Sequence, residues 1–191
     1  MKKPEDFGIT KYDKEKFEKT GILDCFQSVD LRYRNLEKIP FQFGIVDGCF
    51  DCAYNKLKSL YGCPLEVRGF FKCSYNLLES LEGCPQEVHG IFHCSFNKLE
   101  SLEFCPKEVD GDFYCSHNKI KSLKGISQKI KGYLNCYGNS FDMTVQEWLH
   151  YLEKYQKNGL YRSCRIVSDN STYESTLKGL KDKLAILEAL K

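Results

Sequence analysis

The sequence predicts a solenoid of stacked coils with a parallel β-sheet, because the chain repeats itself at a fixed interval of 21 residues. Cysteine, asparagine, leucine, valine and glycine each recur at that interval. Within each repeat, inward and outward positions alternate in the pattern of a short strand with one buried face. One repeat cannot bury its own apolar side, so we expect stacked repeats to share one continuous core.

The repeated positions form columns along the sequence. The columns are Val46, Val67, Val88, Val109 and Ile130; Gly48, Gly69, Gly90, Gly111 and Gly132; Phe50, Phe71, Phe92, Phe113 and Leu134; Cys52, Cys73, Cys94, Cys115 and Cys136; Asn55, Asn76, Asn97, Asn118 and Asn139; Leu57, Leu78, Leu99, Ile120 and Phe141; and Leu60, Leu81, Leu102 and Leu123. A weaker copy precedes them, with Arg34 at the asparagine position. The array therefore spans residues 25–141, about five and a half repeats.

Each repeat is predicted to contain a strand, a turn and an irregular return segment. Val67, Gly69, Phe71 and Cys73 alternate with residues expected to face water, so they form the buried side of the strand. Leu78 is out of phase with this alternation, which indicates that the chain has turned before it. The Gly-Cys-Pro sequence that follows the leucines marks the return.

The wording of the repeat resembles a known family. Residues 71–81, FKCSYNLLESL, resemble the leucine-rich-repeat signature L-x-L-x-x-N-x-L-x-x-L, with Phe71 and Cys73 in the first two apolar positions. The fuller pattern C-S-x-N-x-L-x-S-L-x-G-C-P looks like repeats of bacteriophage and bacterial proteins of this family. The resemblance implies a curved solenoid with strands along its concave side. It also implies that each asparagine side chain bonds backbone groups of adjacent coils.

Cysteine is unusually frequent, with 11 residues in the chain. We expect the Cys52 column to be a ladder of reduced thiols in the core, since buried cysteine packs as a small apolar residue. A second column, on the turn, comprises Cys63, Cys84 and Cys105. Zinc binding by Cys49 and Cys52 is the alternative, but a strand points them to opposite faces and no second pair converges on them. No metal or cofactor is therefore predicted, and a reduced core favours the cytoplasm, or the host cytoplasm for a viral protein.

The outward positions vary while the inward ones repeat, which is typical of a recognition surface on a constant scaffold. We expect the partner-binding residues to be Arg68, Phe70, Lys72, His89, Ile91, His93, Asp112, Tyr114 and Tyr133. Aromatic anchors with a mixed charged rim are typical of protein-binding patches, although isolated exposed apolar residues are also normal. His89 beside Asp110 is predicted to be an ion pair rather than a catalytic dyad. The column of Ser74 is expected to be exposed on the same face.

Several classes of function are disfavoured. The sequence contains no phosphate-binding glycine loop, no H-E-x-x-H motif and no nucleophile with an evident base, so we predict that the protein is not an enzyme. A net charge of +2 makes nucleic-acid binding unlikely to be its role, since acidic residues are interspersed with the basic ones. No apolar stretch approaches the ~20 residues of a membrane span, and no signal peptide is expected.

Both ends of the array are predicted to be covered by helical segments. Residues 1–24 form the N-terminal cap, with a short helix that begins after Asp13 and stops at Gly21. Residues 142–191 form a helical or α/β C-terminal cap.

Three elements are expected in the C-terminal cap. A first helix begins at Thr144 and ends at Gly159, with apolar residues at helical spacing. These residues are Val145, Trp148, Leu149, Leu152 and Tyr155. A short strand follows over residues 160–168, and a final helix starts at the capping box of Ser171 and Glu174.

These observations favour a non-enzymatic module that binds a partner protein through the concave strand face. The bacteriophage-like wording suggests a phage-encoded inhibitor of a host defence protein. The alternative is an assembly component that oligomerises through its end caps, and the sequence does not decide the oligomeric state. An enzyme centred on Cys164 is disfavoured, because only about 50 residues follow the array.

Overall fold

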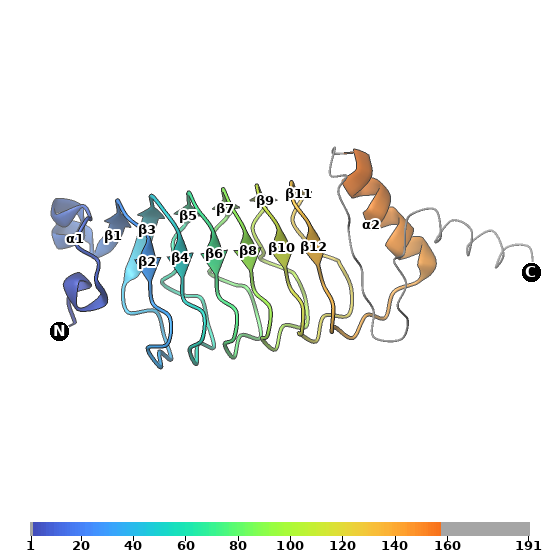
Figure 1. The fold of residues 1–191 in the computed structure, drawn as a ribbon, viewed down its shortest axis with the longest axis horizontal. Helices are drawn as coiled ribbons and strands as arrows, with labels where there is room; N and C mark the ends of the chain where they lie inside the picture. Colours follow the sequence, from blue (N-terminus) through green and yellow to red (C-terminus); the bar gives the residue numbers. More distant parts are fainter. Residues whose placement is uncertain (1, 158–191) are drawn as a thin grey trace, which may run out of the picture.

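The computed structural model describes residues 2–157, with side chains described for residues 2–151. Successive coils follow one another along the long axis of the molecule, from helix α1 to helix α2 (Figure 1). The elements outside the coils are the 3-10 helix η1 (Pro4–Phe7), α1 (Lys14–Thr20) and α2 (Val145–Lys157). The predicted solenoid of parallel strands with a 21-residue repeat is confirmed, since equivalent residues of neighbouring coils pair in register.

Within the described residues, the strands form two six-stranded parallel sheets. The first comprises β1 (Ile22–Cys25), β3 (Gln42–Val46), β5 (Glu66–Val67), β7 (Glu87–Val88), β9 (Glu108–Val109) and β11 (Lys129–Ile130). The second comprises β2 (Val29–Asp30), β4 (Phe50–Asp51), β6 (Phe71–Lys72), β8 (Phe92–His93), β10 (Phe113–Tyr114) and β12 (Leu134–Asn135). Each coil therefore contributes one very short strand to each sheet.

The prediction of a single strand in each repeat is wrong in detail, because the chain bends at the glycine column. The amide of Gly69 donates to the carbonyl of Gly48 in the preceding coil, whereas the amide of Phe71 donates to Ile91 in the following coil. In a regular strand, amides two residues apart point to the same neighbour. The reversal splits the predicted strand into two.

The glycine column exists because the coils approach too closely there for a side chain. A Cβ atom added at Gly90 would lie 2.9 Å from the carbonyl carbon of Gly69, and one added at Gly111 would lie 2.8 Å from that of Gly90. Both separations are shorter than van der Waals contact. The repeated glycine is therefore required by coil-to-coil packing at the bend.

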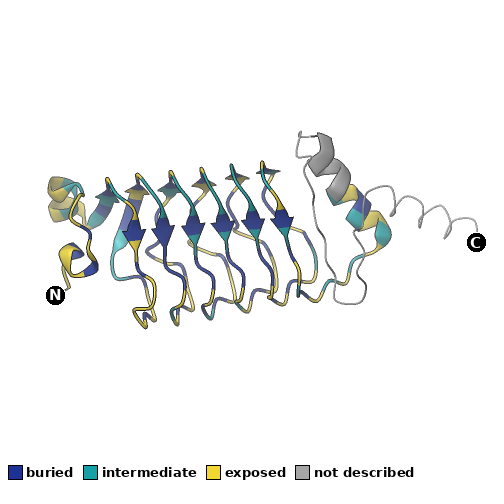
Figure 2. Cartoon of the chain, in the orientation of Figure 1, coloured by how far each residue is buried: buried dark blue, intermediate teal, exposed yellow. Residues whose placement is uncertain are grey.

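The predicted core columns are confirmed as one continuous interior (Figure 2). Phe71 and Phe92 are fully buried, with nearly parallel rings whose centroids lie 5.8 Å apart. The two cysteine columns are buried, and Cys73 and Cys94 carry free thiols. Burial raises the pKa of the Cys94 thiol well above its ordinary value.

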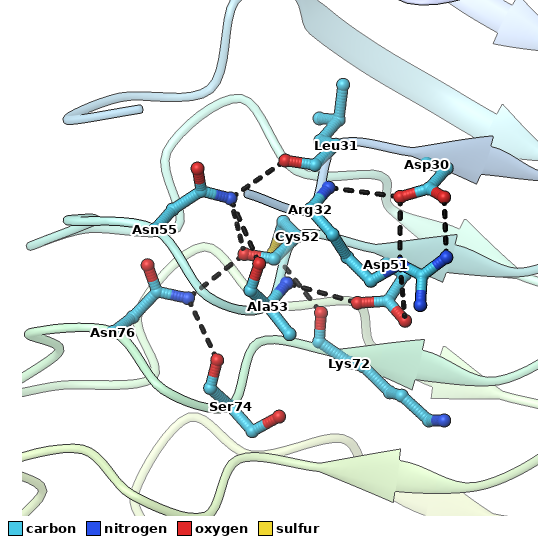
Figure 3. A network of polar contacts seen from close by, with 10 residues as sticks. All are labelled: Asp30, Leu31, Arg32, Asp51, Cys52, Ala53, Asn55, Lys72, Ser74 and Asn76. Atoms are coloured by element: carbon cyan, nitrogen blue, oxygen red, sulfur yellow. Dashed lines mark hydrogen bonds and ion pairs between the residues drawn. The ribbon is translucent and has the colours of Figure 1, made fainter. Parts of the chain in front are cut away.

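The asparagine column joins neighbouring coils, as the family resemblance implies. The Asn76 side-chain oxygen accepts from the Leu57 amide at 2.9 Å. Its nitrogen donates to the carbonyl of Cys52 at 3.0 Å (Figure 3). It also donates to the carbonyl of Cys73 at 3.1 Å. Equivalent bonds surround Asn55, Asn97, Asn118 and Asn139. Each side chain thus satisfies backbone groups that the turn would otherwise leave buried without partners.

The predicted N-terminal helix is confirmed as α1. The Asp13 carboxylate accepts from the Lys16 amide at 2.9 Å, and Gly21 ends the helix with a left-handed backbone at φ 72°. Phe17 packs against the core, and the ring of Phe7 contacts Phe41 edge-on at 5.4 Å.

The predicted start of the C-terminal helix is also confirmed. Thr144 and Glu147 form a capping box, in which the Glu147 amide donates to the Thr144 hydroxyl and the Thr144 amide donates to the Glu147 carboxylate. Leu149 is buried in the core, and Trp148 packs against it. The side chains of Leu152 and Tyr155, the stop at Gly159, the strand over 160–168, Cys164 and the helix from Ser171 and Glu174 lie outside the described residues. Among the described helices, none has the length and apolar character needed to cross a bilayer.

Candidate interaction face

The bend divides the nine predicted binding residues into two groups. Arg68 and His89 follow the strands of the first sheet and lie before the bend. The other seven lie after the bend, in the strands of the second sheet or immediately before them: Phe70, Lys72, Ile91, His93, Asp112, Tyr114 and Tyr133. We call these seven residues the strand-face cluster. Residues predicted to form one grid therefore lie on two neighbouring surfaces.

The first group is engaged within the chain. The Arg68 guanidinium contacts Asp47 at 2.7 Å and Glu66 at 3.1 Å. The predicted contact of His89 with Asp110 is present, with 3.4 Å between the imidazole Nδ1 and the Asp110 carboxylate. The half-exposed ion pairs of Arg68 contribute at most about 1 kcal/mol each to stability. Because its acidic partners are already present, Arg68 has less charge left to offer another molecule.

The centre of the strand-face cluster is a row of three residues that pair across adjacent strands. Lys72 on β6 pairs with His93 on β8, which pairs with Tyr114 on β10. The Lys72 ammonium lies 4.3 Å from the centroid of the Phe70 ring, a cation–π contact. The rings of His93 and Tyr114 lie 5.2 Å apart. These contacts hold four of the seven side chains as two neighbouring pairs.

His93 is the electrostatically unusual member of this row. Burial, and then the neighbouring Lys72 ammonium, lower the pKa of the His93 imidazole from 6.5 to about 4. His93 is therefore neutral at neutral pH, although it stands in a row of polar and charged residues. A neutral imidazole can donate one hydrogen bond and accept another.

Asp112 ties the remaining part of the cluster together. Its carboxylate accepts from the Tyr114 hydroxyl at 2.9 Å and from the Tyr133 backbone amide at 2.8 Å. Ile91 occupies the place in its coil that Phe70 and Asp112 occupy in the coils on either side. The cluster thus extends over four successive coils.

At the N-terminal end of the same row, a carboxylate is held below the surface. Asp51 is only 8% exposed, and its oxygen accepts from the Ala53 amide at 3.1 Å (Figure 3). Arg32 bridges it to Asp30, with contacts of 3.8 Å to Asp51 and 2.7 Å to Asp30. Burial raises the pKa of Asp51, and the Ala53 amide and Arg32 oppose this effect. The alternation of the strand alone did not predict this burial.

The serine column is buried, contrary to the expectation that it would be exposed. Ser74 is 3% exposed and Ser95 is fully buried. The Ser116 hydroxyl donates to that of Ser95 at 2.9 Å, so the small polar residues bond to one another between coils. In each of these coils the residue after the serine carries a ring.

These rings form a second aromatic column, which the sequence analysis missed. We call it the outer aromatic ladder: Tyr33, Tyr54, Tyr75, Phe96 and His117. Successive centroids lie 4.2–4.6 Å apart with interplanar angles of 9–20°. All five residues have a left-handed backbone, with φ between 51° and 56°. The available signal was a ring immediately before the asparagine position in five successive repeats, at the same 21-residue interval.

The chain matches no family model, no curated protein and no solved structure. The functional argument therefore rests on the geometry of the face itself.

Proposed function

We propose that this protein is a leucine-rich-repeat type binding module that recognises another protein through the strand-face cluster. The observation that carries the proposal is a set of contacts on three successive coils, Lys72 over Phe70, His93 against Tyr114 and Tyr114 bonded to Asp112, which strand pairing of Lys72 with His93 brings side by side. Aromatic, apolar and charged groups are mixed in this network in the proportions typical of protein interfaces.

The network also favours binding on entropic grounds. Ordering a long or aromatic side chain at an interface costs about 0.5–1.5 kcal/mol for each residue. Lys72 over Phe70, and Tyr114 bonded to Asp112, are already held by intramolecular contacts. A partner that meets this surface loses less free energy to ordering than it would on a surface of free side chains.

The leucine-rich-repeat assignment is supported by the asparagine column, whose bonds to adjacent coils are those that the family implies. In the same proposal, helices α1 and α2 close the ends of the stack. Phe17 and Trp148 pack against the core at those ends, in agreement with such a role. The narrower proposal, a phage-encoded inhibitor that acts on a host defence protein in the host cytoplasm, rests only on the wording of the repeat.

The test uses charged replacements within the cluster. The tagged wild-type chain is used to capture its partner from its native cell, and the purified pair is then reconstituted. Phe70→Glu and Tyr114→Asp should each abolish that reconstituted complex while the thermal unfolding midpoint remains close to that of the wild type. Tyr61→Glu is the matched control, since Tyr61 is 81% exposed on the return segment and lies outside the cluster. Retention of the complex by both cluster variants would refute the proposal.

A further inference from the structure

The outer aromatic ladder presents the edges of its rings to solvent. Because neighbouring rings stack nearly parallel, as Tyr75 and Phe96 do at 4.2 Å and 10°, each covers the face of the next. At the C-terminal end, Tyr137 meets His117 edge-on at 5.2 Å. Aromatic faces carry the negative part of the ring quadrupole and edges carry the positive part. The exposed strip is therefore weakly electropositive along its length.

The backbone indicates that these rings are retained against a local penalty. A bulky residue with positive φ is an outlier, and such strain costs about 1–3 kcal/mol at each site. In the following coil the same position is Gly138, at φ 69°, so the fold accepts glycine there without strain. Stacking contributes about 0.5–1.5 kcal/mol for each pair and offsets part of the penalty.

A row of lysines runs beside the ladder and is interrupted by Leu77 in the coil between Lys56 and Lys98. Lys56, Lys98 and Lys119 each stand two residues after a ladder residue and are exposed. Their backbone amides bond to the preceding coil at 2.8 Å, so the row is fixed to the stack. No ion pair involves these three lysines within the part of the chain that the structure describes. On the other side of the ladder, three residues before the ladder residue, the same coils carry Asp51, His93 and Tyr114. None of these three side chains is cationic at neutral pH.

We propose that the outer aromatic ladder and this lysine row bind an extended acidic segment of a partner protein. Charge complementarity carries the proposal, since ring edges and unpaired ammonium groups both attract carboxylates. The segment is extended because the two rows run parallel along the stack, at the strand spacing of roughly 4.8 Å. The strip is distinct from the strand-face cluster, and its test uses none of that cluster's residues.

The geometry disfavours single-stranded nucleic acid as the occupant. Proteins of that kind stack bases on exposed aromatic faces, in addition to attracting phosphates. Within the ladder, the faces of Tyr54, Tyr75 and Phe96 are covered on both sides by neighbouring rings. A carboxylate needs only the edge and the lysine, both of which are accessible.

The experiment measures binding of a fluorescein-labelled poly-L-glutamate peptide to the full chain by fluorescence anisotropy. The triple variant Lys56→Gln/Lys98→Gln/Lys119→Gln should bind about 10-fold more weakly, as expected when three exposed charge contacts are lost. The control Lys11→Gln/Lys107→Gln/Lys124→Gln makes the same change in net charge with exposed lysines elsewhere, and should bind like the wild type. Tyr54→Gly/Tyr75→Gly should also weaken binding, since it removes two rings and leaves the lysines.

The remaining outcomes decide against the proposal. Equal weakening by both lysine triples would show general attraction by net charge. Unchanged binding by a folded Tyr54→Gly/Tyr75→Gly variant would show that the rings are not part of the site. If that variant fails to fold, Tyr75→Asn replaces it, since asparagine tolerates positive φ. Binding of an oligothymidylate as tight as that of poly-L-glutamate would assign the strip to polyanions in general. Absence of poly-L-glutamate binding by the wild type at low salt would refute the proposal.

Discussion

The two aromatic columns of this solenoid share one repeat but are stabilised by different forces. In the inner column, Phe71 and Phe92 are fully buried and their centroids lie 5.8 Å apart. In the outer ladder, Tyr75 and Phe96 are more than a third exposed, stack at 4.2 Å and have a left-handed backbone. Burial holds the inner rings, whereas mutual contact holds the outer rings against backbone strain. The same 21-residue period can therefore mark either a core or a surface.

The largest expected effect is the loss of an inner ring. Phe92→Ala leaves a cavity between Phe71 and Phe113, whose ring centroids lie 5.8 and 5.0 Å from that of Phe92. Truncation of a buried phenylalanine costs about 3–5 kcal/mol. Urea unfolding followed by circular dichroism should show that loss, and a change below about 1 kcal/mol would mean that the coils are not packed as described.

The next effect concerns the polar column that joins the coils. In Asn97→Ala, the Leu78 amide loses its acceptor and the carbonyls of Cys73 and Cys94 lose a donor. An unsatisfied buried group costs about 1–3 kcal/mol, so we expect a loss of at least about 2 kcal/mol in the free energy of unfolding. Asn97→Asp restores the acceptor but not the donor and should be less stable than the wild type. Equal stability of all three proteins in urea unfolding would contradict a structural role for the column.

A further effect should appear as a dependence of stability on pH. In the unfolded chain His93 takes up a proton near pH 6.5, whereas in the folded protein its pKa is about 4. As pH falls between these values the unfolded state binds more protons, so stability declines through that window and levels off below it. Above pH 6.5 the residue contributes no pH dependence. His93→Gln should flatten the decline relative to the wild type in unfolding curves from pH 7 to pH 4, and an unchanged slope would exclude His93 as its source.

The period of the sequence was sufficient to predict the core, because each buried column repeats one residue type. Val67, Phe71, Cys73 and Leu78 are all buried as predicted. Three of the seven residues of the strand-face cluster, Lys72, His93 and Tyr114, lie in strands of one sheet, whereas Arg68 and His89 of the predicted grid lie on the other side of the bend. Whether they bind a partner stays a prediction.

Other features depend on contacts between coils that a single repeat does not reveal. Gly69 allows a bend because the Gly48 backbone lies against it, and alternation alone predicts a continuous strand there. Ser74 is buried although the alternation places it on the exposed face, and the residue after it, Tyr75, has a left-handed backbone at φ 54°. An aromatic residue is rarely found with positive φ, so propensity gave no reason to expect Tyr75 in that conformation.

The smallest expected effect tests the comparison most directly, because Phe96 lies in the same coil as Phe92. Phe96→Gly removes stacking on Tyr75 and His117 but relieves a backbone at φ 56°. The two terms are each about 1–2 kcal/mol and opposite in sign, so the net change should be within about 1 kcal/mol of zero. Phe96→Ala loses the stacking and keeps the strain, so it should be less stable than Phe96→Gly by up to about 1 kcal/mol. An alanine variant as stable as the glycine variant in urea unfolding would show that the left-handed backbone is not strained, and the contrast between the two columns would then reduce to exposure alone.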